Sequence, residues 1–245
     1  MSTNLLLEQM ETCRTAILSA VGRADRVEAE RKAFDSLVRS HPAGGPENPG
    51  SRTRWHLGSS TLTDDTGAVL GYTVSLAWVT AGVVTNAVVY VSTTGVVHST
   101  SLSTRSVPRH EEEAESGPAK SKWAQNVNWS APADERLDAV KEALADSGYR
   151  MIPTGSEVLA LLDVAEGRSA GFLGLVADPA ARMAASLLIS EAHGQVSDWS
   201  GRYPALGDDT LVAGSHFTHY HRFARLLAGA DRAAATDAQE VSRHA

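Results

Sequence analysis

The chain has only one cysteine, Cys13, among its 245 residues. A single cysteine cannot form an intramolecular disulfide, so we expect the protein to work in a reducing compartment, the cytoplasm. We expect no signal peptide, because the apolar run at residues 5–7 is short and Glu8 follows it. No apolar run approaches the length that crosses a membrane, so we expect no membrane partner.

Positive charge is also scarce, with 22 lysines and arginines against 29 aspartates and glutamates, a formal net charge of −7. Nucleic-acid phosphates attract basic surfaces, so this balance argues against nucleic acid as a partner. The sequence has no nucleophile elbow, no glycine-rich phosphate loop and no Cys-x-x-Cys pair. His216, His219 and His221 lie close together, but no nearby Cys or Asp completes a zinc set with them.

Apolar sequence is plentiful, at 42% of the chain, which is enough for one sizeable core or two tightly joined subdomains. A strand is expected to begin at Trp55, and three further runs rich in β-branched residues follow it. These runs are residues 71–79, 83–92 and 96–100, joined by turn sequences at 80–82 and 93–95. The pattern predicts an antiparallel meander that is buried on at least one face.

Helical periodicity appears at both ends of the chain and after the meander. Helices are expected at residues 3–21, 25–40 and 134–145, a strand at 123–130, a solvated acidic linker at 107–122 and a frayed helical tail at 228–245. We therefore divide the chain into an N-terminal α+β half, residues 1–125, and a C-terminal α/β half, residues 126–245.

The stretch from 155 to 194 predicts a helix, a short buried strand and a second helix. Thr154 or Ser156 can cap the first helix, and Thr154 with Glu157 has the spacing of a capping box. Asp178 is expected to cap the second helix, with Pro179 at its first position, where a missing N–H costs little. The second helix is apolar nearly all round, so it should be buried.

Three motifs in this region follow one another at a spacing typical of a known family. They are the Gly-Ser-x-x-x-x-Leu-x-x-Val-Ala-x-Gly-Arg pattern at 155–168, Glu-Ala-His-Gly at 191–194 and Asp-Trp-Ser-Gly at 198–201. The stretch from about 155 to 227 resembles the C-terminal half of the inositol monophosphatase superfamily, the metal-dependent sugar-phosphate phosphatases. The resemblance implies a layered α/β/α/β/α sandwich.

The resemblance also shows which family residues are missing. The family's Trp-Asp pair, whose Asp binds metal, is Ala180-Ala181 here. Aligned from Trp55, the family's Asp-Pro-x-Asp-Gly-Thr motif, expected at the end of the strand, loses both carboxylates and keeps only the hydroxyl of Thr63. The two replaced aspartates correspond to Gly58 and Thr61, and an acidic residue on the substrate side corresponds to Gly174. Divalent cations such as Mg²⁺ require oxygen ligands, so we expect no metal cofactor.

A displaced metal site is the alternative. Asp64 and Asp65 could represent the family's aspartate loop shifted downstream, although the same residues also suit a hairpin turn. Glu47, in a loop rich in Gly and Pro, is the nearest counterpart of the family's metal-binding Glu. These three carboxylates would then hold Mg²⁺, with Thr63 beside them.

Three functional interpretations follow. The first is a pseudoenzyme that has lost metal-dependent phosphatase activity and acts as a binding or partner subunit. The second is an enzyme that uses the same cleft for metal-independent chemistry on a small polar substrate, with Glu157 as acceptor and general base. The third is a Mg²⁺-dependent phosphatase with displaced ligands.

The resemblance also indicates residues at two helix starts as ligand-binding residues, namely Gly155, Ser156 and Asp178. Because members of the family commonly pair, we expect a homodimer or a heterodimer with a related subunit.

Overall fold

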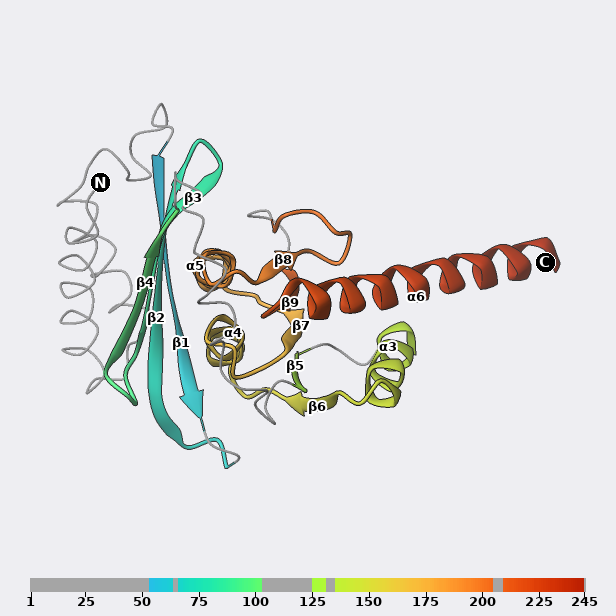
Figure 1. Cartoon of the computed structure of the whole chain (residues 1–245), viewed down its shortest axis with the longest axis horizontal. Helices are drawn as coiled ribbons and strands as arrows, with labels where there is room; N and C mark the ends of the chain where they lie inside the picture. The colour runs from blue at the N-terminus through green and yellow to red at the C-terminus, as the bar shows by residue number, and fades with distance from the viewer. Residues whose placement is uncertain (1–52, 64–65, 103–124, 131–134, 205–208, 245) are drawn as a thin grey trace, which may run out of the picture. The chain divides into compact units, whose positions relative to one another are not determined.

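The computed structural model describes residues 53–63, 66–102, 125–130, 135–204 and 209–244 (Figure 1). The helices expected at 3–21 and 25–40, and the candidate ligands Glu47, Asp64 and Asp65, lie outside these residues. The chain forms two compact units, and the second helix of the 155–194 stretch belongs to the first unit although it is late in the sequence. The division at residue 125 expected from the sequence places this helix with the C-terminal half instead.

The first unit contains an antiparallel sheet of four strands in the order β1-β2-β3-β4. The strands are β1 (Thr53–Thr63), β2 (Val69–Thr80), β3 (Val83–Val91) and β4 (Val96–Ser101). Ala81 and Gly82 both have positive φ, 52° and 83°, which suits the tight turn that joins β2 to β3. The predicted meander is therefore confirmed, with its boundaries shifted by at most two residues.

Strand β1 agrees with the hairpin alternative, because its residues before position 64 pair with the residues of β2 from Val69 onward. It pairs with β2 without a register shift from Thr53 to Leu62, and so continues through Gly58, where the resemblance predicted the strand to end. The physical reason is local, because Ser59 stands where the family motif has a proline. A serine retains the backbone N–H that a strand ladder uses, whereas proline lacks it.

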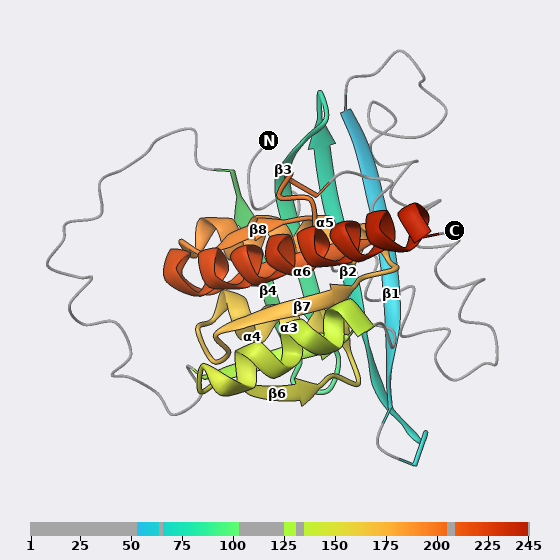
Figure 2. The same ribbon diagram turned by 90° about the vertical axis from the view of Figure 1, so that its right-hand side faces the viewer.

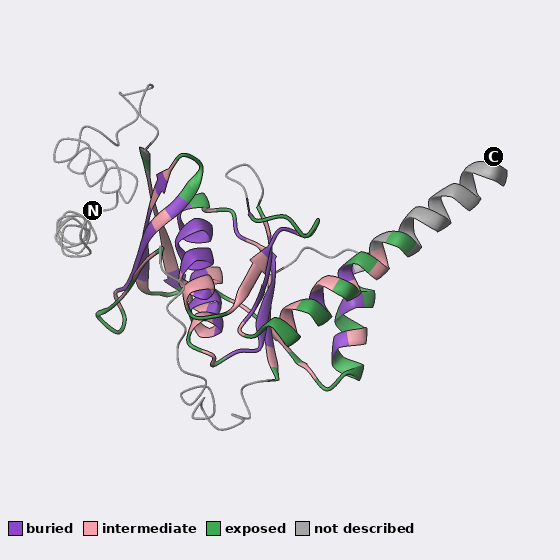
Figure 3. Cartoon of the chain, turned by 45° about the horizontal axis from the view of Figure 1, so that its top comes forward, coloured by how far each residue is buried: buried purple, intermediate pink, exposed green. Residues whose placement is uncertain are grey.

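Helix α5 (Pro179–Glu191) packs on this sheet, and most of its residues are buried (Figure 3). On the sheet face beneath α5, Gly58 of β1 lies opposite Ser75 of β2, and Ala77 of β2 lies opposite Ala87 of β3. Small residues on both surfaces allow the helix to approach the sheet closely. The prediction that this helix would be buried is confirmed.

The second unit contains a mixed five-stranded sheet in the order β6-β5-β7-β9-β8. Its strands are β5 (Asn126–Ser130), β6 (Arg150–Pro153), β7 (Gly171–Leu175), β8 (Gln195–Ser197) and β9 (Thr210–Gly214). β5, β6 and β7 are parallel, while β9 is antiparallel to both β7 and β8.

Helices cover both faces of this second sheet. α3 (Glu135–Asp146) and α6 (Phe217–His244) lie on one face, where Val127 and Phe223 join a common core (Figure 2). α4 (Glu157–Ala165) lies on the other face, where the carboxamide of Asn128 donates to the carbonyl of Ala160 at 3.3 Å. The tail expected as a frayed helix is part of α6, which continues to His244.

Candidate functional site

The start of helix α5 is built around Asp178. Its Oδ1 accepts a hydrogen bond from the backbone N–H of Ala180 at 2.9 Å, as predicted for an N-cap. The same carboxylate lies directly over Gly58 of β1: an ideal Cβ on Gly58 would be 2.0 Å from Asp178 Oδ2 and 2.3 Å from Oδ1. A side chain at position 58 and the present position of Asp178 therefore exclude each other.

Ala180 and Ala181, at the start of α5, have side chains without an oxygen atom that could bind a cation. Ala180 and Ala181 are 1% and 0% exposed. Thr63, the last residue of β1, is exposed and five residues beyond Gly58, which is about 17 Å along an extended strand. Within the described parts of the chain, no group of three His, Cys, Asp or Glu side chains is placed to hold a metal ion.

Gly174, which the resemblance aligned with an acidic residue, has no room beside it for a side chain. It is buried in β7 beside Ser130 of β5, and an ideal Cβ would lie 2.3 Å from the carbonyl oxygen of Ser130. The obstacle here is backbone, which cannot rotate away as a side chain can. A side chain at position 174 therefore does not fit the present backbone.

The start of helix α4 holds the other predicted residues. Ser156 is the N-cap, and its hydroxyl accepts from the N–H of Leu159 at 3.4 Å. The capping box proposed for Thr154 and Glu157 is wrong, because Glu157 is the first residue of the helix and Thr154 binds both backbone groups of Ser156 instead. Gly155 is exposed, with no atom within 4 Å of an ideal Cβ, so the space beside it is open.

Glu157 has a partner that the sequence did not suggest. Its Oε1 accepts a hydrogen bond from the hydroxyl of Ser130 at 2.9 Å. Ser130 is the last residue of the parallel strand β5, and ligands in α/β sheets bind at the carboxyl ends of such strands. That rule, applied to the strand expected at 123–130, would have identified Ser130.

The predicted site residues thus form two clusters in different units. Asp178 lies with Gly58 in the first unit, and Gly155, Ser156 and Glu157 lie at the start of α4 in the second. The chemistry available in the second cluster is that of a carboxylate with a serine hydroxyl, which can accept or donate hydrogen bonds to a polar ligand.

The Asp-Trp-Ser-Gly motif forms a tight turn. Asp198 accepts hydrogen bonds from the hydroxyl of Ser200 at 2.7 Å and from the backbone N–H of Arg202 at 2.8 Å. Burial alone would raise the pKa of Asp198, but these hydrogen bonds and the charge of Arg202 lower it below its ordinary value. Asp198 therefore stabilises the turn as an ionised carboxylate.

The histidines near the C-terminus do not share a partner set. His219 Nδ1 lies 2.8 Å from the hydroxyl of Tyr149, and His216 Nδ1 lies 3.1 Å from the hydroxyl of Thr218. Burial, followed by the charges of His216 and Arg222, lowers the pKa of His219. His219 thus serves as a packed, hydrogen-bonded residue where α6 begins.

Comparison with solved structures confirms the expected fold. The structure is similar to extragenic suppressor protein suhB from Bartonella henselae, with a TM-score of 0.67 and 19% identity over 93% of this chain and 99% of that one. It is similar to SaIMPase-II with bound inositol monophosphate, with a TM-score of 0.72 and 16% identity over 97% and 98% of the two chains. For the inositol monophosphatase of Anabaena (Nostoc) sp. PCC 7120 the values are 0.62, 17%, 93% and 97%.

The chain therefore has an α/β fold of the inositol monophosphatase type. At these identities the likeness shows the fold alone. No protein-family model matches the sequence, and a search of curated proteins finds no significant relative. No helix in the described residues is long and apolar enough to span a membrane.

Proposed function

We propose that this protein is a divergent relative of the inositol monophosphatases that has lost metal-dependent phosphatase activity and acts as a binding or partner subunit. The observation that carries this proposal is the contact between Gly58 and Asp178. The carboxylate of Asp178 occupies the space into which a side chain at position 58 would project.

Two divalent cations held close together require several anionic oxygens. In the family alignment, Gly58, Thr61 and Ala181 replace three of the carboxylates that supply them. Asp178 does not substitute well for these residues, because one of its oxygens already caps α5 through Ala180. A cation bound by Asp178 would compete with the N–H of Ala180 for the same carboxylate.

The test is calorimetric titration of the full chain with Mg²⁺ and Mn²⁺, together with assays of phosphate release from inositol monophosphate and sugar phosphates. We expect no saturable binding at millimolar metal and no metal-dependent release. Saturable binding that disappears in Asp64→Asn would overturn the proposal and support the displaced-ligand phosphatase, with Glu47 and Asp65 as its other ligands.

A second candidate function rests on the hydrogen bond between Glu157 and Ser130. Without cations, a cleft bordered by Glu157 would repel phosphate and favour a neutral or cationic polar ligand. Glu157 would then act as a hydrogen-bond acceptor and general base, with Gly155 and Ser156 of the same helix start contributing to ligand binding.

We also propose that the protein is cytoplasmic and pairs, either with itself or with a catalytically complete relative. The single cysteine supports a reducing compartment. The pairing is supported by the dimers that are common in the family that the motifs resemble. Light scattering at micromolar concentration should give a dimer mass for a homodimer. A monomer mass, with no related subunit recovered by pull-down, would contradict the pairing.

A further inference from the structure

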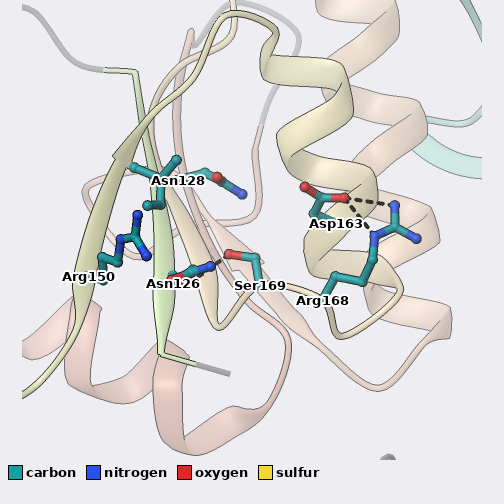
Figure 4. A pocket seen from close by; sticks show the side chains of 7 residues that line it. Asn126, Asn128, Arg150, Asp163, Arg168 and Ser169 are labelled. Carbon is teal, nitrogen blue, oxygen red and sulfur yellow. Dashed lines mark hydrogen bonds and ion pairs between the residues drawn. The ribbon is translucent and has the colours of Figure 1, made fainter. Parts of the chain in front are cut away.

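The second unit has a pocket of about 400 Å³ at the amino ends of β5 and β6. Figure 4 shows Arg150 projecting from β6 on one side and Asp163 with Arg168 on the other, with Asn126 and Asn128 of β5 between them. This pocket lies at the end of β5 opposite to Ser130 and Glu157. Its volume is within the range of about 300–1,000 Å³ that small-molecule sites occupy.

Much of the lining is held in place by internal hydrogen bonds. Ser169, which is 3% exposed, donates its hydroxyl to the carbonyl of Asn126 at 2.7 Å. Asn128 is 7% exposed and is held by its bond to Ala160 of α4. On the far wall, Arg168 binds Asp163 through Nε at 2.9 Å. The polar groups are therefore positioned before any ligand arrives.

Arg150 is the exception. Among the residues that the structure describes, its guanidinium has no ion-pair partner, and the side chain of Asn126 has no recorded hydrogen bond. Arg168, by contrast, pairs with Asp163 and also with Glu166, which is not part of the lining. With Glu166 included, two arginines meet two carboxylates, and both carboxylates pair with Arg168, which leaves the charge of Arg150 for a ligand.

From this geometry we propose that the pocket binds a small organic molecule with one carboxylate or phosphate group. The guanidinium of Arg150 matches the planar carboxylate or phosphate oxygens and can donate two parallel hydrogen bonds to them. The carboxamides of Asn126 and Asn128 then face hydroxyl or carbonyl groups of the same ligand. The inference does not depend on the proposed loss of phosphatase activity.

The experiment is a ¹⁵N–¹H correlation spectrum of the full chain titrated with inorganic phosphate and, separately, with glycerate, at constant ionic strength in chloride. The expected result is a saturable shift of the Arg150 Nε–H resonance and of the Asn126 and Asn128 carboxamide resonances. A response to phosphate alone assigns a phosphate ligand, and a response to glycerate alone assigns a carboxylate. No saturable shift with either probe would overturn the proposal.

The matched variants are Arg150→Gln and Arg225→Gln. Both arginines are exposed, but Arg225 lies on α6, outside the pocket. Arg150→Gln should weaken binding about tenfold or more, because it removes a charge-assisted hydrogen bond, while Arg225→Gln should bind as the unmodified chain does. Equal binding by Arg150→Gln, or equal weakening by both variants, would overturn the assignment. A melting curve for each variant confirms that it is folded.

Discussion

Replacing Gly58 by alanine tests directly whether Asp178 occupies the space beside position 58. The new methyl group would lie 2.0 Å from Asp178 Oδ2, which is closer than any real contact, so the carboxylate must move. When it moves, it loses the 2.9 Å hydrogen bond to the N–H of Ala180 that caps α5. The substitution at β1 is therefore transmitted to the start of a helix more than one hundred residues later.

The size of the effect follows from two opposing terms. Loss of an N-cap costs about 0.5–2 kcal/mol, and residual crowding adds about 1 kcal/mol, the low end of the usual cost of overpacking. Replacing glycine by alanine restricts the unfolded chain and returns about 0.4–1 kcal/mol. We expect Gly58→Ala to lower the free energy of unfolding by about 1–2 kcal/mol in urea titrations.

The double variant isolates the contact. Asp178→Ala alone should cost about 1 kcal/mol, since the cap is lost. With the carboxylate absent, Gly58→Ala should then be neutral or slightly stabilising, giving a coupling of about 1–2 kcal/mol between the two sites. Gly155→Ala is the control, because nothing lies within 4 Å of an ideal Cβ there, and it should change stability by less than about 0.5 kcal/mol. Additive costs for positions 58 and 178 would refute the reasoning.

Three further predictions concern the second unit. Gly174→Ala should lower the free energy of unfolding by at least about 1–3 kcal/mol, because the methyl group meets the backbone carbonyl of Ser130; an unchanged urea midpoint would contradict this. Because burial lowers the pKa of His219 below 6.5, the unfolded chain binds its proton first, so stability should fall as the pH drops through 6.5. Measured as melting temperature against pH, this fall should be smaller in His219→Gln and unchanged in His221→Gln, a change at an exposed position. Equal pH profiles for the two variants would show that protonation of His219 does not cause the fall. Glu157→Gln keeps an acceptor for Ser130 and should melt near the unmodified temperature while weakening ligand binding or activity; lost stability with full function would make this residue structural only.

Local sequence chemistry predicted much of the fold. The meander followed from β-branched runs separated by turn residues, and Gly95 has the positive φ of 69° that suits its turn. The start of α5 followed from Asp178 and Pro179, whose roles at a helix start depend only on the next few residues. The spacing of the family motifs led to the fold type that the solved structures confirm.

Where the sequence left two chemically close alternatives, the structure chose between them. Thr154 and Ser156 both have hydroxyls that can cap a helix, and only the backbone path shows that Ser156 does so. The resemblance implied that β1 ends at Gly58, whereas the hairpin alternative implied a longer strand. Pairing with β2 decided for the longer strand, since each added residue completes hydrogen bonds of the ladder.

By itself, the sequence determined that Gly58, Thr61 and Ala181 carry no carboxylate in any conformation. Only the tertiary structure decided which distant residues meet. The carboxylate of Asp178 over Gly58, and the bond from Ser130 to Glu157, join residues 120 and 27 positions apart, and no local pattern encodes such distances. Both contacts arise because a helix start and a strand meet in three dimensions. At Gly58, the space that a side chain would fill is filled by Asp178, since protein interiors are closely packed.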